Sequence, residues 1–232
     1  AASTLSAGEA ARVSLARAFA TRPEVLFLDE PFARLDEPTR LALTRDLAAV
    51  LPTTDATVVF VTHDRSEAAA IATRVVVLES GRIAQEGDPA RLLEHPHTRA
   101  AARWAGFENI LAGRLLESHA GHERVEIAPG VVLDCVGKRP DGTDVAACFR
   151  AESVALARSV DEIHGSIRNR FRARVVAVSA RSGGTVIAGV AAGESGPVIA
   201  AILTAESAEA LGIVAGAEVV AAIKAAAIHV VA

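Results

Sequence analysis

Two short apolar runs in the first part of the chain end in polar residues that can do chemistry. The first run, Val25–Leu28, leads into Asp29 and Glu30, and the second, Thr57–Val61, leads into Thr62-His63-Asp64. Uninterrupted apolar runs of this length are typical of parallel strands that are buried on both faces. We therefore expect two neighbouring strands whose carboxyl ends present two carboxylates and an imidazole.

Helical spacing surrounds these strands. Apolar residues recur at three- and four-residue intervals after the stretch LSAGE, Leu5–Glu9, so a helix is expected to begin just behind Ser6 and Gly8. A hydroxyl and a glycine at a helix N-terminus present backbone N–H groups to an anion. Further expected elements are a helix over 66–72, a strand over 75–78, a turn over 79–82 and a helix that starts at Asp88-Pro89. This alternation predicts an α/β region that ends near Trp104–Phe107.

The carboxyl end of such a sheet is where ligands of open α/β proteins gather. Asp29 can hold Mg²⁺ there, and Glu30 can orient and deprotonate a water molecule that attacks a terminal phosphate. His63 follows the second strand and is expected at the same edge. On these residues alone, the alternative is a solvated acidic pair that opens a loop.

Beyond residue 107 the pattern changes to short β-type runs separated by glycine, proline and aspartate, which predicts a small all-β barrel or sandwich. This half also repeats itself. The segment from Asn109 matches that from Asn169 at an offset of 60 residues, and the segment from Val145 matches that from Val219 at an offset of 74. An insertion in the second copy accounts for the difference. Its expected place is Thr204–Ala217, a short helix capped by threonine or serine and followed by a glycine.

Composition narrows the function classes. At 232 residues and 51% hydrophobic, the chain can bury a sizeable core and holds two domains or parts of domains. A net charge of −4 and only 3% aromatic residues argue against nucleic acid as a partner. No uncharged apolar run reaches the roughly 18 residues of a membrane-spanning helix. Cys135 and Cys148 have neither metal nor redox spacing, so we expect reduced core residues, with a disulfide left open.

The second copy of the repeat opens with Ser166, Arg168 and Asn169, just before an expected strand, and its late strand carries Lys224. A hydroxyl, a guanidinium, an amide and an ammonium suit a tetrahedral oxyanion, because several donors converge while the charges neutralise it. Only Lys138 and Lys224 of the 24 basic residues are lysine, which favours a specific use for the compact charge of Lys224. The alternative is a polar turn with a solvated lysine.

Four motifs, in order, resemble those of the ATP-binding subunit of ABC transporters. LSAGE is similar to the LSGGQ signature, VLFLDEP to the Walker B strand, ARLD to the D-loop and THD to the switch-histidine loop. The resemblance implies ATP as substrate, Asp29 as the Mg²⁺ ligand, Glu30 as the catalytic base and His63 as a sensor of the γ-phosphate.

The same resemblance implies that Ser6, Gly8 and Asp36 meet ATP at the interface of a homodimer. Ala7 and Glu9 depart from the signature, where the family has glycine and glutamine. A methyl group and an extra negative charge close to phosphate weaken that contact.

The family also requires a Walker A loop, G-x-x-x-x-G-K-[ST], whose backbone holds the phosphates. The only Gly-Lys pair, Gly137-Lys138, has Val132 at the first glycine position and Arg139 where serine or threonine should follow, and the chain contains no methionine. We therefore expect a fragment whose phosphate-binding segment lies upstream, and we expect the 232 residues alone to be inactive as an ATPase.

The last third of the chain resembles the Mop type of TOBE domain, an OB-like β module found on importer ATPases for molybdate and tungstate and on molybdate-binding proteins. The match runs from SIRN through ILTAESAEALGIVAGAEVVAAIKA. It implies an oxyanion site, formed where modules meet, that uses Ser166, Arg168, Asn169 and Lys224. The family often has a serine after the lysine, where this chain has Ala225, so one hydroxyl contact is missing.

The expected fold is therefore α/β, the C-terminal part of a P-loop ABC ATPase domain, followed by an all-β OB-like TOBE/Mop region. The expected boundaries are residues 1–104 for the ATPase part, 105–163 for a first β lobe without a site, and 164–232 for the oxyanion-binding lobe.

The resemblances imply the ATP-hydrolysing subunit of an importer, with ATP, Mg²⁺ and a regulatory molybdate or tungstate as its ligands. They imply a homodimer that works with transmembrane permease subunits at the cytoplasmic face of the bacterial cell membrane, and indirectly with a periplasmic or extracellular oxyanion-binding protein. Two alternatives stay open. One keeps the ATPase but serves an importer for sulfate, iron, polyamine or sugar. The other is a non-enzymatic oxyanion-binding module whose ATPase half is vestigial.

Overall fold

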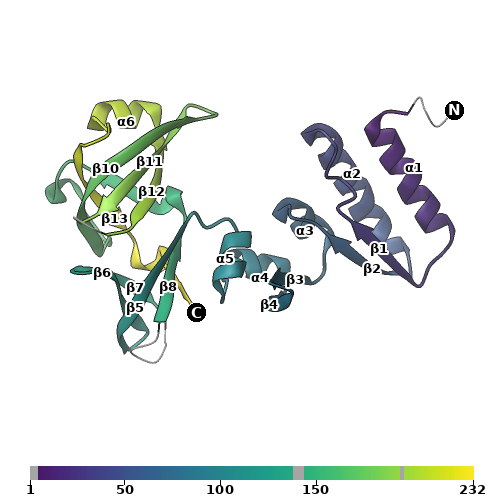
Figure 1. Cartoon of the computed structure of the whole chain (residues 1–232), viewed down its shortest axis with the longest axis horizontal. Coiled ribbons are helices and arrows are strands. Elements are labelled where there is room, and N and C mark those ends of the chain that lie inside the picture. Colours follow the sequence, from purple (N-terminus) through teal and green to yellow (C-terminus); the bar gives the residue numbers. More distant parts are fainter. Residues whose placement is uncertain (1–4, 138–143, 194–195) are drawn as a thin grey trace. The chain divides into compact units, whose positions relative to one another are not determined.

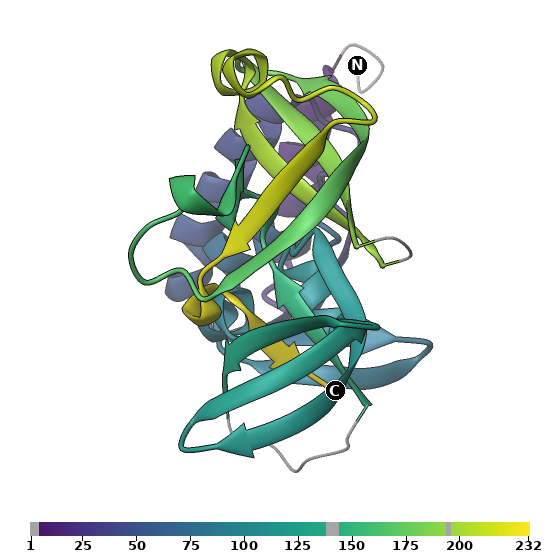
Figure 2. The same ribbon diagram turned by 90° about the vertical axis from the view of Figure 1, so that its left-hand side faces the viewer.

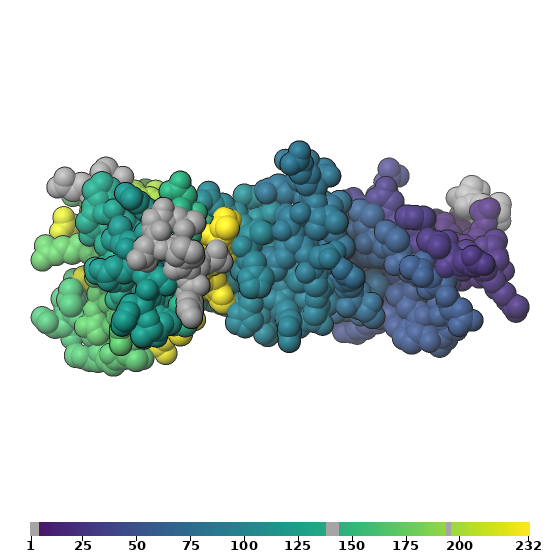
Figure 3. Space-filling model, turned by 90° about the horizontal axis from the view of Figure 1, so that it is seen from below, coloured from purple at the N-terminus to yellow at the C-terminus, as the bar shows by residue number. Residues whose placement is uncertain are grey.

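The computed structural model describes residues 5–137, 144–193 and 196–232, so Lys138 lies outside the described residues. The chain forms two compact units (Figure 1). The first unit comprises the chain up to Val76 together with Glu86–Arg91, and the second comprises Val77–Gln85 and Leu92–Ala232. In the space-filling view of Figure 3, the purple surface belongs to the first unit and the green and yellow surface to the second.

The first unit is built on two parallel strands with helices packed against them. In chain order its elements are α1 (Ala7–Ala20), β1 (Val25–Asp29), α2 (Glu37–Val50), a 3₁₀ turn (Leu51–Thr53), β2 (Thr57–Val61) and α3 (Arg65–Ile71). β1 and β2 pair in parallel, with Asp29 opposite Val61. The core between the strands and the helices consists of Leu26, Leu28, Phe32, Leu43 and Leu47.

The opposite face of the β1–β2 pair is apolar and exposed. Phe27 is 72% exposed, and Val25, Val59 and Val61 are 41–50% exposed. The expectation that the strand Val25–Leu28 is buried on both faces is therefore wrong for the described residues. Exposure alternates along β1, because the apolar residues of α1 and α2 pack against one face only.

A hairpin and two short helices follow. β3 (Val75–Glu79) pairs with β4 (Arg82–Gly87) through a turn at Ser80 and Gly81, whose φ angles of 50° and 75° fit a tight type I′ hairpin. α4 (Pro89–Glu94) starts behind Asp88, whose Oδ1 accepts the Arg91 N–H at 3.0 Å, and α5 is Arg99–Trp104. The turn over 79–82 and the helix start at Asp88-Pro89 are confirmed.

The second unit contains two five-stranded antiparallel sheets (Figures 1 and 2). We call the sheet with the order β14-β8-β5-β6-β7 the first lobe and the sheet with the order β12-β11-β10-β13-β9 the second lobe. The strands of the first repeat are β5 (Asn109–His119), β6 (His122–Ala128), β7 (Val131–Val136), β8 (Asp144–Phe149) and β9 (Val154–Ala157). Those of the second repeat are β10 (Asn169–Arg181), β11 (Thr185–Ala192), β12 (Val198–Thr204), β13 (Glu218–Ile223) and β14 (His229–Val231).

The two lobes exchange their last strands. β9 follows β8 in the chain but pairs with β13, while β14 follows β13 but pairs with β8. The strand orders of the two sheets correspond one to one, which confirms the internal repeat. The insertion is confirmed as well: α6 (Ala205–Leu211) is capped by Thr204 and ends at Gly212.

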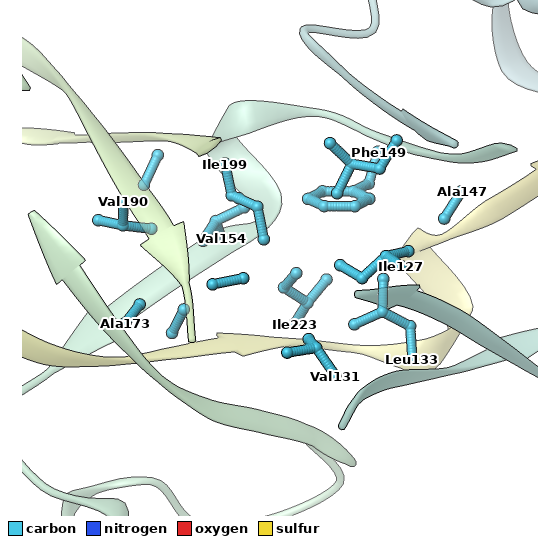
Figure 4. Packing of buried hydrophobic residues seen from close by; sticks show 14 of the residues in the cluster. Ile127, Val131, Leu133, Ala147, Phe149, Val154, Ala173, Val190, Ile199 and Ile223 are labelled. Carbon is cyan, nitrogen blue, oxygen red and sulfur yellow. The ribbon is translucent and has the colours of Figure 1, made fainter. Parts of the chain in front are cut away.

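The exchanged strands close one core that both lobes share. Figure 4 shows it between the sheets, with Ile127, Leu133 and Phe149 from the first lobe and Val190, Ile199 and Ile223 from the second. These six side chains are at most 9% exposed. The lobes are therefore expected to unfold together, because the apolar face of each sheet is buried only while the other sheet is folded.

Candidate functional site

The backbone turns sharply just after β1. Asp29 and Val61 form the last pair of the parallel ladder, and the Glu30 N–H donates to the Val61 carbonyl at 3.0 Å. Glu30 has a φ of 42°, in the left-handed region that is costly for a residue with a Cβ and that is concentrated at functional sites. The backbone thus holds the Glu30 side chain beside Asp29 at the carboxyl edge of the sheet.

His63 meets Glu30 across the two strand ends. Its Nδ1 lies 3.1 Å from Glu30 Oε1, and the two side chains are 77% and 47% exposed. An ionised carboxylate can only accept, so the contact orients the imidazole with its Nδ1 proton toward Glu30. The structure therefore brings together two residues that the sequence placed at one sheet edge.

A hollow of about 540 Å³ opens between the first turns of α1 and the segment after β1. Asp29 and Glu30 line it together with Arg34, and Ala7 and Ser14 line it from α1. A single carboxylate such as Asp29 fits Mg²⁺, which binds one or two carboxylates alongside phosphate oxygens and water. Within the described ranges no group of three or more His, Cys, Asp or Glu residues could hold a metal ion by itself, so phosphate and water would have to supply the other ligands. Sequence reasoning missed Arg34, which carries a positive charge into the hollow.

The stretch Leu5–Glu9 begins α1 as expected. Ser6 is the N-cap: its Oγ accepts the Glu9 N–H at 3.2 Å, while Glu9 Oε2 accepts the Ser6 N–H at 2.8 Å. Glu9 therefore closes a capping box, and the hydrogen bonds from Ser6 lower the pKa of its carboxyl group. A Cβ on Gly8 would lie 2.6 Å from Thr39 Cγ2, so glycine permits the close approach of α1 to α2.

Asp36 is the N-cap residue of α2. Its side chain is exposed and makes no capping hydrogen bond within the described residues. The Arg40 N–H donates to the Asp36 carbonyl at 2.9 Å, which fixes the start of the helix directly behind it. The carboxylate of Asp36 therefore points to no local structural role.

Asn169, assigned by the sequence to an oxyanion, is committed to the backbone of the first lobe. Its Oδ1 accepts the Asp134 N–H at 2.6 Å and its Nδ2 donates to the Asp134 carbonyl at 2.9 Å, with the residue 3% exposed. Asn109, its counterpart in the repeat, pairs in the same way with Ala200 at 2.7 and 3.0 Å. We refer to these two pairings as the amide clamps. Because the amide of Asn169 serves a clamp, we leave it out of the oxyanion site proposed below.

Lys224 directly follows β13 and is exposed. It lines a hollow of about 550 Å³ beside the edge strands β9 and β12, together with Ser153, Ser207 and Glu152. The hydroxyls of Ser153 and Ser207 are candidates that sequence reasoning missed, although Ser207 lies in the predicted inserted helix. Glu152 opposes an anion there, because like charges repel.

Ser166 and Arg168 precede β10 as expected, and both are exposed. Neither is among the described residues that line the hollow beside Lys224. A single copy of the chain therefore does not gather the four side chains around one point.

Arg150 occupies the position in the first repeat that corresponds to Lys224. Its Nη2 donates to the carbonyls of Leu93 and Ala105 at 3.4 and 3.3 Å, and its Cζ lies 4.7 Å from the centroid of the Phe107 ring. Both carbonyls lie at the C-terminal ends of the short helices α4 and α5, where partial negative charge accumulates. In the first lobe this cation thus binds the carbonyls at the chain's own helix ends.

The two cysteines are buried free thiols, as expected for core residues. Burial raises the pKa of Cys135 and of Cys148 to about 12, with nearby acidic groups adding to the effect at Cys135. At neutral pH both thiols are therefore protonated.

Comparison with known proteins agrees with the two halves of the structure. Residues 1–33 match the family model described as ABC transporter, and residues 165–230 match the model described as TOBE domain. The chain is thus similar to ABC transporters at its beginning and to TOBE domains in its last part.

Curated relatives match longer parts of the chain. A sulfate/thiosulfate import ATP-binding protein of Thermosynechococcus vestitus is 38% identical over 148 residues, which is 62% of this chain and 44% of that protein. A spermidine/putrescine import ATP-binding protein of Rubrobacter xylanophilus is 36% identical over 165 residues, covering 69% and 44%. An Fe(3+) ions import ATP-binding protein of Streptomyces coelicolor is 48% identical over 106 residues, covering 46% and 30%. The chain spans less than half the length of these three relatives.

A solved structure is similar in fold to about half of the chain. The cytoplasmic molybdate-binding protein ModG, with molybdate bound, matches with a TM-score of 0.50 at 21% identity, over 54% of this chain and 96% of that one. At this identity the likeness is one of fold, and the predicted fold class is confirmed. In the part of the chain that the structure describes, no helix is both long and apolar enough to span a membrane.

Proposed function

We propose that the chain belongs to the ATP-hydrolysing subunit of an ABC importer. The observation that carries this proposal is the 3.1 Å contact between Glu30 and His63 at the carboxyl ends of two parallel strands. A carboxylate in that position can accept a proton from water, and an imidazole beside it can interact with a terminal phosphate. Asp29 would hold Mg²⁺, which neutralises charge on the phosphates when it is bound.

The remaining parts of this proposal concern partners. Ser6, Gly8 and Asp36 would meet the nucleotide of a second subunit in a homodimer, which agrees with the exposed and locally uncommitted carboxylate of Asp36. Permease subunits at the cytoplasmic face of the bacterial membrane, and indirectly a periplasmic or extracellular binding protein, complete the proposed importer. This arrangement rests on the resemblance to ABC transporters, and the curated relatives are named as import ATP-binding proteins.

The test uses a form of the protein that includes a phosphate-binding loop. Glu30→Gln should lower ATP turnover at least about 100-fold and leave nucleotide binding within a few-fold, because it removes a positioned base but keeps the side-chain shape. Asp46→Asn is the matched control, since it neutralises a carboxylate that is 60% exposed on α2. Turnover by Glu30→Gln within a few-fold of the wild type would remove Glu30 from the role of base and favour the non-enzymatic alternative.

For the second unit we propose regulatory binding of molybdate or tungstate. Lys224, with Ser207 and Ser153 beside it, supplies a cation and hydroxyl donors around one hollow. Ser166 and Arg168 would complete the anion site from a neighbouring copy of the module. The fold shared with a molybdate-binding protein supports this ligand class, whereas the names of the relatives keep importers of sulfate, iron or polyamines as the alternative.

Isothermal titration of the 232-residue chain with molybdate, tungstate, sulfate and spermidine separates these cases. Because a charge-assisted hydrogen bond contributes about 1.5–3 kcal/mol, Lys224→Ala and Arg168→Ala should each weaken molybdate binding roughly 10- to 150-fold. Arg174→Ala is the control, since that side chain is 64% exposed and pairs loosely with Glu218 at 3.6 Å. Equal losses from Lys224→Ala and Arg174→Ala, or heat from spermidine alone, would contradict the proposed site.

A further inference from the structure

A network of polar side chains lies directly behind His63. Glu67, on α3, is a buried carboxylate at 6% exposure, and its Oε2 accepts the Thr62 hydroxyl at 2.6 Å. The Thr62 Oγ1 in turn accepts the Asp64 N–H at 2.9 Å. These two hydrogen bonds join the residue before His63 to the residue after it and tie both to α3.

Asp64 adds a second constraint on the same segment. Its Oδ1 accepts the N–H groups of Ser66 and Glu67 at 2.7 and 3.3 Å, so it caps α3. Burial raises the pKa of Asp64, but these N–H groups and the charge of Arg40 outweigh it and the net shift is downward. Asp64 therefore stays ionised at neutral pH, and its cap remains in place.

Arg40 links this network to α2. Its Nε lies 3.8 Å from Asp64 Oδ2 and 3.9 Å from Glu67 Oε1, and its side chain is 32% exposed. Arg40 lies one helical turn behind Asp36, whose carbonyl accepts its backbone N–H at 2.9 Å. One guanidinium thus connects the start of α2 to the segment that carries His63.

Stability alone does not explain a buried carboxylate at this position. Taking a charge out of water costs several kcal/mol, and an apolar side chain of similar volume often serves the folded state equally well. The partners of Glu67 are a hydroxyl at 2.6 Å and a guanidinium at 3.9 Å. This arrangement instead fixes the backbone conformation on both sides of His63. The His63 side chain is 77% exposed, so packing holds it only weakly.

We propose that Glu67, acting through Thr62 and held by Arg40, is the positioning residue that sets the imidazole of His63 against Glu30. This inference rests on the proposed ATPase function, in which His63 and Glu30 act on one phosphate. Arg40 also connects the start of α2, at Asp36, to the segment that carries His63. A displacement of Asp36 is therefore expected to change the position of His63.

The first test uses the 232-residue chain and does not depend on catalysis. In nuclear magnetic resonance spectra, Thr62→Val and Glu67→Gln should shift the His63 ring resonances toward those of a free histidine. Hydrogen exchange of the Asp64 amide should become at least about 10-fold faster in Thr62→Val, because its acceptor is gone. Thr62→Ser keeps the hydroxyl and should restore both signals. Asp46→Asn, which breaks the exposed Arg12–Asp46 pair, is the control and should change neither.

The second test uses a form that includes a phosphate-binding loop. Glu67→Gln, Thr62→Val and Arg40→Gln should each lower kcat about 10-fold with KM for ATP within about two-fold, because a displaced catalytic group lowers the rate without removing binding contacts. His63→Ala is measured alongside. If His63→Ala turns over ATP at the wild-type rate, the proposed function fails. If His63→Ala is impaired while Glu67→Gln and Thr62→Val keep both wild-type kcat and unshifted His63 resonances, only the positioning role is overturned.

Discussion

Replacing Asn169 by alanine should destabilise the second unit without removing the anion binding proposed for it. The side chain makes two hydrogen bonds to the backbone of Asp134, which lies on β7, the edge strand of the first lobe. Asn109 does the same for Ala200 on β12, the edge strand of the second lobe. Each edge strand has a neighbour on one side only in its own sheet. On its open side the amide makes the two hydrogen bonds that the backbone of a further strand would make.

The expected loss of unfolding free energy follows from the backbone groups that lose their hydrogen-bond partners. Asn169→Ala leaves one N–H and one carbonyl of Asp134 without the amide, and Asp134 is only partly accessible to water. At about 1–1.5 kcal/mol for each such group, the free energy of unfolding should fall by about 2–3 kcal/mol. Asn109→Ala should cost a similar amount, because its two bonds have the same geometry. Asn169→Asp should cost more, since it sets a carboxylate oxygen against the Asp134 carbonyl.

Trp104 allows a direct assay. It is the one tryptophan of the chain, and it packs against the apolar cluster that includes Ala102, Phe107 and Cys148 of the second unit. Urea unfolding followed by its fluorescence, with linear extrapolation to water, gives the free energy of this unit. Glu209→Ala, on the exposed face of α6, is the control and should stay within about 0.5 kcal/mol of the wild type. Unchanged unfolding of Asn169→Ala, combined with loss of molybdate binding, would refute the clamp and return Asn169 to the anion site.

Three further predictions concern the same unit. Arg150→Ala should lower the free energy of unfolding by about 1.5–3 kcal/mol in the Trp104 assay, because it removes charge-assisted bonds to two helix ends, whereas the exposed Arg181→Ala should not. Burial, with the charges of His95 and Arg150, lowers the pKa of His229, so the free energy of unfolding should fall as the pH drops below about 6.5. His229→Gln should make this fall smaller, and a variant with the wild-type pH profile would contradict the prediction. Cys135 and Cys148 should react with a thiol reagent only after unfolding, because burial raises each pKa to about 12, and rapid labelling of the native chain would overturn this.

Local patterns and motifs were sufficient for the fold class, and matches between distant segments were sufficient for the repeat and the inserted helix. Neither was sufficient for the exchange of β9 and β14. The segments that exchange are four and three residues long, and alternation within so short a run is equally compatible with either sheet. The exposed face of β1 could not be predicted for a related reason. An apolar run indicates that a strand can be buried, but it does not show which elements cover it. The described helices leave Phe27 72% exposed.

The candidate site divides in the same way. Glu30 and His63 could be placed together because parallel strands bring their carboxyl ends to one edge, and topology alone carries that inference. Asn169 could not be resolved from sequence, since an amide before a strand suits an anion and a backbone clamp equally well. The signal was present in the repeat: the chain contains only two asparagines, at equivalent positions, while only one copy has the neighbouring Ser166 and Arg168. A residue retained in the copy without a site has a structural use in both.

The same comparison of repeats separates the two cations. Arg150 and Lys224 occupy equivalent positions, yet Arg150 spans two helix carbonyls and an aromatic ring while Lys224 is exposed beside a hollow. A guanidinium has the planar set of donors that two carbonyls and a ring face require, and an ammonium has the compact charge that suits a small anion. An exchange of the two residues should therefore harm both sites: Arg150→Lys would lose the ring contact and one carbonyl, and Lys224→Arg would bring a larger, less strongly hydrated group to the hollow. The duplicated lobes thus use one position differently: Arg150 stabilises the fold, whereas Lys224 is exposed beside a hollow, where we propose that an anion binds.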